Sequence, residues 1–161
     1  MKHIIALIIL TLPILVFGND YINITNNTLD KKKAKINLYG DAGTWGLVHS
    51  LFMNLETYIT SSKSDKLHLY LRGAYGDVIL FSGGSGTSSF HRNTKTKVGA
   101  LTLITGKGEH HFDSSAGIFI RDDDVLPFLD LGYRFQNING GIIFRGKVGI
   151  LGLGVGLGYA F

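Results

Sequence analysis

A possible hydrolase triad lies between His110 and Ser115. The two adjacent histidines are followed by Asp113 and Ser115, which supply the residue types of a serine–histidine–carboxylate site. Adjacent residues of a strand point to opposite faces, so His110 and His111 are not expected to share one site. Sequence spacing alone does not bring the serine, the histidine and the acid into hydrogen-bond geometry. We therefore predict no catalytic residues here, and without a spaced second pair of ligands we predict no metal site.

Two further segments have the composition of ligand sites. The aspartates 122–124 offer carboxylate oxygens of the kind that Ca²⁺ prefers. The Ser/Gly tract 82–89 resembles a phosphate-binding loop in composition, but no strand-to-helix context surrounds it. We expect a solvated loop for the first segment and a flexible loop for the second. No cofactor is predicted.

The first 18 residues have the three parts of a secretory signal. A short basic start is followed by the apolar run Ile4–Phe17 and by small residues at the expected cleavage site. The run is shorter than the roughly 20 residues that a membrane-spanning helix needs. We therefore expect residues 1–18 to be removed after export, residues 19–33 to form a polar lead, and residues 34–161 to form the folded domain.

Composition narrows the class of the mature chain. The chain has no cysteine, so an exported form has neither disulfides nor a lipoprotein attachment thiol. The 22 glycines and two prolines favour strands and tight turns over helices. The formal net charge of +4 falls to about +3 when the signal with Lys2 is removed, and this mildly basic balance suits an anionic lipid surface. Nucleic acid is not an expected partner, because the lysines at 31–35 adjoin an export signal and lie on no helix with interleaved aromatic residues.

The last segment gives the clearest strand pattern. From Leu151 to Phe161, bulky apolar side chains alternate with glycine or, at position 160, alanine. One face of this strand is apolar and the other is almost bare, and its length suits a tilted membrane span of ~9–11 residues. Glycine weakens a strand, so a row of glycines needs a reason. We infer that the bare face borders a crowded interior filled by long side chains from other strands.

Other segments alternate apolar residues with polar or charged ones. A soluble sheet would bury the apolar face, whereas a membrane barrel turns that face to lipid and the charges inward. The export signal, the glycine-lined strand and the aromatic chain end favour the membrane barrel. An Arg or Lys facing lipid at the midplane would cost ~2–4 kcal/mol. We therefore predict an inward-facing charge network of Glu56, Arg72, Asp130, Arg134, Arg145 and Lys147. It is interpreted as a structural salt-bridge plug, with a narrow solute or ion path as the alternative.

The predicted fold class is all-β, with a single eight-stranded antiparallel up-and-down transmembrane β-barrel. The expected strands are 35–41, 45–59, 66–76, 96–105, 109–120, 127–136, 141–147 and 150–161. An even number of strands places both termini on one side, which we assign to the periplasm. The expected periplasmic turns are 60–65, 106–108 and 137–140, and the expected outer connections are 42–44, 77–95, 121–126 and 148–149.

Three stretches resemble one known family. Leu126–Gln136 followed by Asn139–Arg145 is similar to a hairpin of small outer-membrane β-barrel proteins found in Bacteroidetes-type bacteria. Gly106–His110 resembles that family's short Gly-Lys turn. Gly156–Phe161 looks like the general closing signal of outer-membrane barrels, a glycine followed by two spaced aromatic residues at the chain end. The chain departs from the family in the short connection after Arg145.

The resemblance implies a barrel in the outer membrane of a Gram-negative bacterium, inserted by the barrel-assembly machinery. It implies no defined activity. Gly156, Tyr159 and Phe161 would form the assembly signal, recognised by strand addition to an exposed edge.

Two functional hypotheses follow from the sequence. The first is a non-enzymatic, monomeric barrel in contact with outer-membrane lipids, which serves the envelope structurally or through its outer loops. The second is a soluble exported β-barrel that binds an apolar ligand in its interior. A narrow solute path and a lipid-modifying enzyme are less favoured alternatives.

Overall fold

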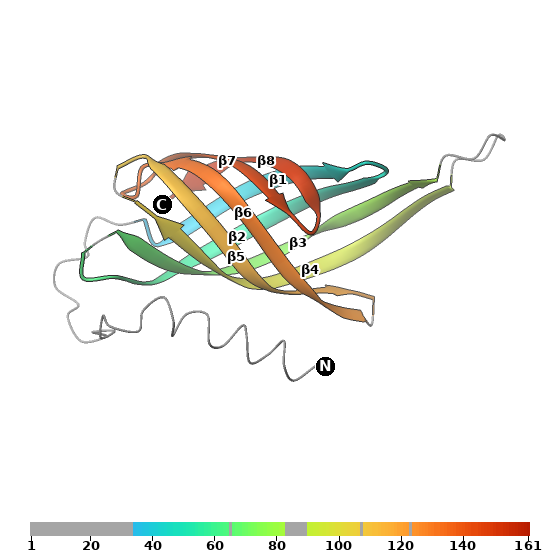
Figure 1. Ribbon diagram of the computed structural model, residues 1–161, viewed down its shortest axis with the longest axis horizontal. Helices are drawn as coiled ribbons and strands as arrows, with labels where there is room; N and C mark the ends of the chain where they lie inside the picture. Colours follow the sequence, from blue (N-terminus) through green and yellow to red (C-terminus); the bar gives the residue numbers. More distant parts are fainter. Residues whose placement is uncertain (1–33, 65, 83–89, 107, 123) are drawn as a thin grey trace.

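The computed structural model describes residues 34–64, 66–82, 90–106, 108–122 and 124–161, and within this part the side chains of residues 80–93 are left undescribed. The described residues form eight strands (Figure 1): β1 Ile36–Trp45, β2 Val48–Ser61, β3 Leu67–Ser82, β4 Phe90–Thr105, β5 His110–Arg121, β6 Asp124–Gln136, β7 Gly141–Gly149 and β8 Gly152–Ala160. Each strand pairs antiparallel with the next, and β8 pairs with β1 to close the barrel. The all-β fold class and the closed eight-stranded antiparallel barrel are thus confirmed. The predicted signal 1–18 and lead 19–33 lie outside the described residues.

The last strand closes the barrel along its whole length. Its pairing with β1 runs from Asn37 opposite Ala160 to Thr44 opposite Leu153. Beyond the strand end, the Phe161 amide donates to the Ile36 carbonyl at 2.8 Å, and the Lys35 amide donates to the Phe161 carbonyl at 2.7 Å. Closure leaves no free edge at the seam where an exposed strand would otherwise recruit another chain.

Most of the outer connections are shorter than the sequence predicts. We expected a long loop over 77–95, but β3 runs to Ser82 and β4 starts at Phe90. The paired backbone continues through this stretch, and the Lys95 ammonium lies 2.9 Å from an Asp77 carboxylate oxygen across the hairpin. The polar residues of this stretch indicated a loop, because a run of polar residues is equally compatible with a loop and with a strand that extends past the apolar part of the barrel wall. The resulting β3–β4 hairpin extends farthest from the body of the barrel (Figure 1).

The other three outer connections also differ from the prediction: two are shorter, and the one predicted at 148–149 is displaced along the chain. The predicted connections 42–44 and 148–149 are strand, and the turns follow them at Gly46–Leu47 and Ile150–Leu151. The predicted loop 121–126 is mostly strand, because β6 begins at Asp124. Gly46 allows its turn to be tight, since its φ of 60° lies in the left-handed region that glycine adopts without strain. The seventh strand is slightly longer than predicted.

Strand β7 is shorter than β6 and pairs with only part of it. Only Asp130–Gln136 of β6 have partners in β7, so the outer half of β6 is unpaired on that side. Where this pairing ends, the Ile150 amide donates to the Leu129 carbonyl at 3.1 Å. Alternate residues of a strand direct their backbone groups to the same side, so Pro127 faces the unpaired edge. Proline has no N–H to offer there, which is why an edge tolerates it.

Side chains fill the barrel in layers. An apolar cluster occupies the end away from the C-terminus and comprises Phe52, Ala74, Val78, Val98, Ala100, Phe119 and Phe128. A smaller cluster near the C-terminus comprises Ala34, Tyr39, Ile143 and Ala160. Charged and polar side chains lie buried in the interior as well. No helix among the described residues is long and apolar enough to cross a membrane.

Candidate functional site: the charged interior

Eight buried charged side chains lie inside the barrel, among the residues that the structure describes. Four are carboxylates and four are cations: Asp41, Glu56, Asp113, Asp130, Arg72, Arg134, Arg145 and Lys147. The structure thus places all six residues of the predicted network in the interior and adds Asp41 and Asp113. The predicted six comprised two carboxylates and four cations. Since buried charges are stable only when paired, charge balance already called for two more carboxylates.

Ion pairs join the eight groups into one alternating chain. Its order is Lys147, Asp41, Arg72, Asp130, Arg145, Asp113, Arg134 and Glu56, with successive N···O distances of 2.5, 3.2, 3.0, 2.7, 2.7, 2.8 and 2.7 Å. The partners come from six strands, and most pairs bridge strands that are not neighbours in the sheet. The chain therefore crosses the lumen instead of following its wall.

At one end of this chain of ion pairs, the Glu56 carboxylate is saturated with hydrogen bonds. The Arg134 guanidinium donates to both oxygens of Glu56, at 2.7 and 2.9 Å. The Tyr39 hydroxyl donates to Glu56 at 2.6 Å, and the Asn37 amide donates to it at 3.1 Å. A bidentate pair with further donors is the strongest arrangement of its kind. It offers no free oxygen to a substrate or an ion.

Arg72 joins Asp41 to Asp130 within the chain of ion pairs. Its guanidinium donates to the Asn54 side-chain oxygen at 2.9 and 2.7 Å, in addition to the two carboxylates that it pairs with. The guanidinium carbon lies 5.7 Å from the Tyr39 ring centroid and 5.2 Å from that of Phe128. These ring contacts suit the weakly hydrated guanidinium and leave it no room to swing.

The inward glycines of β8 make space for this chain. A Cβ on Gly154 would lie 2.9 Å from Lys147 Cε, and one on Gly156 would lie 3.2 Å from Asp41 Cβ. A Cβ on Gly158 would overlap with Tyr39 and with a backbone carbonyl. The bare face inferred from the sequence therefore borders long side chains from β1 and β7.

The outer wall is apolar. Large hydrophobic side chains point away from the lumen on the strands, and half-exposed examples include Leu51, Leu55, Leu71, Leu129, Phe144, Leu153 and Leu157. At the C-terminal end of β8, the rings of Tyr159 and Phe161 lie 5.0 Å apart, and both side chains are exposed on the outside. Gly156, the third residue of the predicted assembly signal, is buried on the inward face.

The residues of the possible hydrolase triad are kept apart. His110 is exposed on the wall, whereas both ring nitrogens of His111 lie 3.0 Å from backbone carbonyls, those of Thr105 and Gln136. Asp113 is bound by two arginines of the charge chain, and the Ser115 hydroxyl lies 2.8 Å from that of Thr102. The geometry therefore assembles no nucleophile with a base.

No metal site is formed within the described part of the chain. No group of three or more His, Asp or Glu side chains converges there. Asp122 and Asp124 are exposed at the β5–β6 turn, and Asp123 lies outside the described residues, as do most residues of the Ser/Gly tract.

Comparisons with known proteins were made for the whole chain. No family model, curated protein or solved structure matches it. The family resemblance inferred from the sequence therefore stays a prediction, and the site is interpreted from its geometry.

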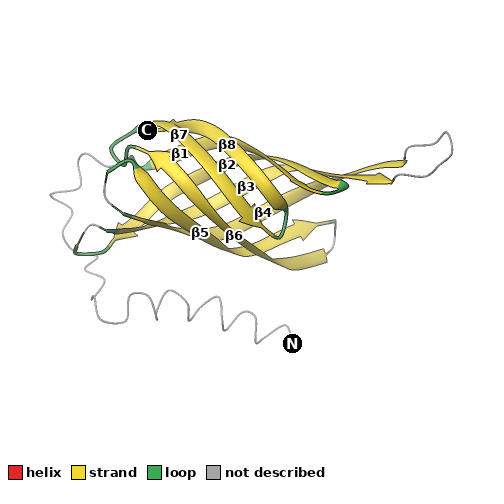
Figure 2. Ribbon diagram, turned by 45° about the horizontal axis from the view of Figure 1, so that its top comes forward, coloured by secondary structure: helices red, strands yellow, loops and turns green. Residues whose placement is uncertain are grey.

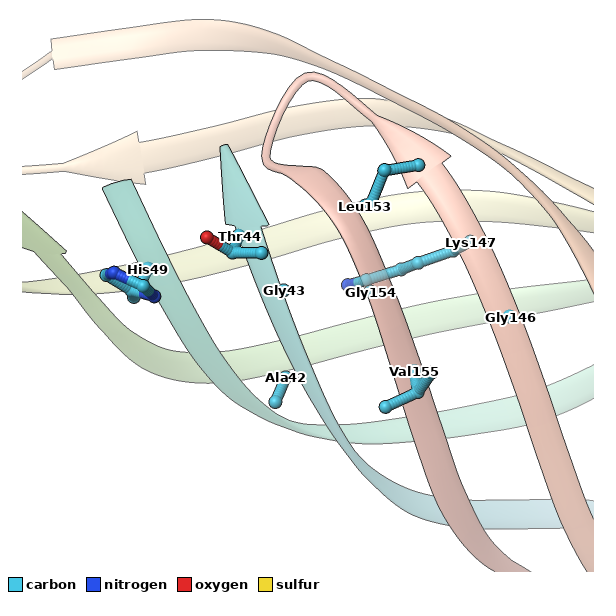
Figure 3. Close-up of a pocket in the computed structure, with 9 residues that line it drawn as sticks. All are labelled: Ala42, Gly43, Thr44, His49, Gly146, Lys147, Leu153, Gly154 and Val155. Atoms are coloured by element: carbon cyan, nitrogen blue, oxygen red, sulfur yellow. The ribbon is translucent and has the colours of Figure 1, made fainter. Parts of the chain in front are cut away.

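A shallow hollow marks the outer wall over β7, β8 and β1. It measures about 580 Å³ and is lined largely by small or apolar residues, among them Ala42, Gly146, Leu153 and Val155. Figure 3 shows the Lys147 side chain reaching from β7 towards Gly154 of β8. The hollow is open to the outside, and Lys147, which is paired with Asp41, is its charged lining residue.

Proposed function

We propose that this chain is a small outer-membrane β-barrel protein with a side-chain-filled lumen, exported by a cleaved signal and inserted by the barrel-assembly machinery. Its role is structural in the envelope or is carried by contacts of its outer hairpins, and it performs no catalysis. One observation carries the proposal: the interior holds a neutral chain of eight charges, while the exterior is apolar. In water, this arrangement would expose the hydrophobic wall and bury the charges.

The height of the apolar band on the outer wall supports the proposal. On β3 the outward positions from Leu67 to Tyr75 carry no charge, with Lys66 and Asp77 at either end. Eight residue steps of about 3.3 Å give about 26 Å along the strand. A tilt of about 40° reduces this to about 20 Å, close to the ~25 Å band of outer-membrane barrels.

The alternative of a soluble binding protein receives less support. Such a protein needs an apolar cavity inside and a polar wall outside. The apolar residues inside this barrel pack against one another in two clusters, and the eight buried charges are joined to one another by ion pairs. The family resemblance of the sequence points in the same direction as the membrane proposal.

The same filling argues against a solute path. The apolar layer with Phe52 and Phe128 and the charge chain both lie across the lumen. We expect the purified protein to give no steady ionic current in planar bilayers at neutral pH, with an open porin as the positive control. Stepwise currents of constant size would contradict the plugged lumen.

Cell fractionation with a heat-modifiability gel tests the proposal. A closed barrel should be found in the outer-membrane fraction and should migrate differently before and after boiling. A protein that is soluble in the periplasm or in the medium, with no shift on the gel, would overturn the proposal.

The assembly signal can be separated from the barrel structure with Phe161→Ala. The Phe161 side chain is 65% exposed, while its backbone makes the closing hydrogen bonds, which alanine retains. We expect Phe161→Ala to lower the amount of folded protein in cells several-fold and to leave refolding of the purified chain in detergent unchanged. Phe144→Ala, another exposed aromatic on the wall, is the control and should behave like the wild type in both settings. Equal loss in cells and in detergent would show that Phe161 acts only through stability.

A further inference from the structure

Charged side chains outside the lumen are shared unequally between the two ends of the barrel. The tip of the β3–β4 hairpin and Phe161 mark opposite ends (Figures 1 and 2). Among the described side chains, the charges at the hairpin end balance, and they are Lys95, Lys97, Arg121, Asp77, Asp122 and Asp124. Those at the Phe161 end are Lys35, Lys63 and Lys66, against Glu109 and the carboxylate of Phe161. Since the eight interior charges cancel, the positive excess of the described part lies at the Phe161 end.

The three lysines of this end belong to neighbouring strands. Lys35 directly precedes β1, Lys63 lies in the β2–β3 turn, and Lys66 directly precedes β3. Because β1, β2 and β3 are adjacent in the sheet and all three side chains are exposed, they form one basic stretch, which we call the basic rim. In the sequence, Asp65 interrupts this stretch and three lysines at 31–33 precede it, and these four residues lie outside the described part.

The basic rim adjoins the apolar wall. Lys35 is followed by Ile36, which is 45% exposed, and Lys66 is followed by Leu67, the first outward residue of the uncharged stretch of β3. A lysine stem can lie along apolar surface while its ammonium group reaches the polar layer beside it. On a barrel that spans a bilayer, these ammonium groups would therefore reach the level of the lipid phosphates.

The described part of the chain supplies no counter-ion to Lys35 or Lys66. The Tyr58 amide donates to the Lys35 carbonyl at 2.9 Å, and the Gly106 amide donates to the Lys66 carbonyl at 2.7 Å, so the residues that face the two lysines carry no charge. Neither lysine takes part in an ion pair with a described residue. At the other end, by contrast, Lys95 is paired with an acid across its hairpin.

We propose that the basic rim binds the phosphate groups of anionic phospholipids and gathers these lipids around β1–β3 in the periplasmic leaflet. The inference rests on the proposed outer-membrane function, because the rim meets headgroups only if the wall spans the bilayer. A lysine close to a bilayer surface favours anionic lipids on the order of fivefold, so the rim should enrich them several-fold. The acidic polymer of the cell wall is a poorer fit, since it lies beyond the headgroups, whereas Lys35 and Lys66 lie at the edge of the apolar wall.

Brominated lipids can measure this enrichment through a fluorophore on a single cysteine, since the chain has none of its own. Leu69→Cys on β3 carries the probe near the basic rim, and Leu129→Cys on β6 carries it on another part of the wall. The labelled chains are refolded into phosphatidylcholine vesicles that contain a minor fraction of brominated phosphatidylglycerol or, for reference, the same fraction of brominated phosphatidylcholine. Both leaflets have one composition, so the orientation of the barrel does not affect the result. We expect the anionic lipid to quench the probe at 69 several-fold more than the reference lipid does, and the two lipids to quench the probe at 129 alike.

Charge variants show whether the lysines cause the preference. Lys35→Gln combined with Lys66→Gln should remove most of the preference at 69 and leave the folded fraction on an unboiled gel unchanged. The matched control combines Lys95→Gln with Lys97→Gln at the other end of the barrel and should retain the preference. High salt should weaken the preference in the unaltered chain, because it screens exposed charges.

Two results would overturn the inference, and they are distinguishable. If the two brominated lipids quench the probe at 69 equally and both also quench the probe at 129, the barrel spans the bilayer but the basic rim selects no lipid. Cosedimentation with isolated peptidoglycan that is lost in the Lys35→Gln, Lys66→Gln variant would then assign the rim to the cell-wall polymer. If neither lipid quenches either probe, the wall does not face lipid, and the proposed function fails together with the inference.

Discussion

Replacing Arg134 with methionine is expected to lower the free energy of unfolding by about 3–5 kcal/mol, the usual cost of breaking a buried ion pair by removing one partner. Arg134 neutralises two carboxylates, Glu56 and Asp113, and all three side chains are fully buried. Methionine fills a similar volume but leaves the Glu56 charge without a cation. Denaturant titration of the refolded protein, followed by the heat-modifiable band, measures the change.

A double replacement separates charge from packing. Glu56→Gln removes the charge that Arg134→Met leaves unpaired, and glutamine can still accept the hydrogen bond from Tyr39. We therefore expect the double variant to be more stable than the summed effects of the two single changes predict. The difference should be about 0.5–3 kcal/mol, the range typical of directly interacting residues. Lys66→Met is the control, because it removes an exposed cation just before β3. It should change the free energy of unfolding by less than about 0.5 kcal/mol. Strict additivity of the two buried changes would show that the ion pair does not contribute as a unit.

Gly158→Ala is expected to prevent or strongly impair closure of the barrel. A Cβ at this position overlaps with Tyr39 Cβ and with the Leu38 carbonyl, so β8 cannot approach β1 without displacing a side chain that holds Glu56. Overpacking of a filled interior typically costs about 1–3 kcal/mol, and here the affected contact is the closing seam itself. The measurement is the folded fraction on an unboiled gel after refolding.

The matched control is Gly146→Ala on the neighbouring strand. Gly146 faces outward, and nothing lies within 4 Å of a Cβ built on it. Alanine there should fold as well as the wild type. If both alanine variants fold equally well, the inward glycines of β8 are not required for space, and their presence needs another explanation.

The alternation of residue types predicted most of the fold. Period-2 patterns predicted the eight strands and the inward direction of the six charges, because apolar residues occupy one face of each strand and polar residues the other. The antiparallel order followed from the short connections between successive strands. The pattern could not predict how far β3 and β4 extend, since Asp77 and Lys95 pair with each other in a ladder beyond the apolar band. In that region the alternation of apolar and polar residues no longer applies.

The prediction of the site fell short for a related reason. Asp41 is the last residue of one expected strand and Asp113 lies on the polar face of another, yet neither was included in the predicted network. Alternation gives the face of a residue but not its partner on the opposite wall. The contact between Glu56 and Arg134 joins residues 78 positions apart, and only charge balance could have hinted that two acids were missing.

The charge chain also constrains the order of folding. Its pairs join residues far apart in sequence, with separations of 106 for Lys147–Asp41, 78 for Arg134–Glu56 and 58 for Arg72–Asp130. Contacts of such range make folding slow, because loop closure precedes the gain in energy. A half-formed sheet of β1 to β3 would hold the Asp41–Arg72 ion pair but would leave the buried Glu56 without its cation, Arg134. Stable partial barrels are therefore not expected, and closure of the barrel should proceed as one cooperative event in which β6 and β7 bring the matching charges.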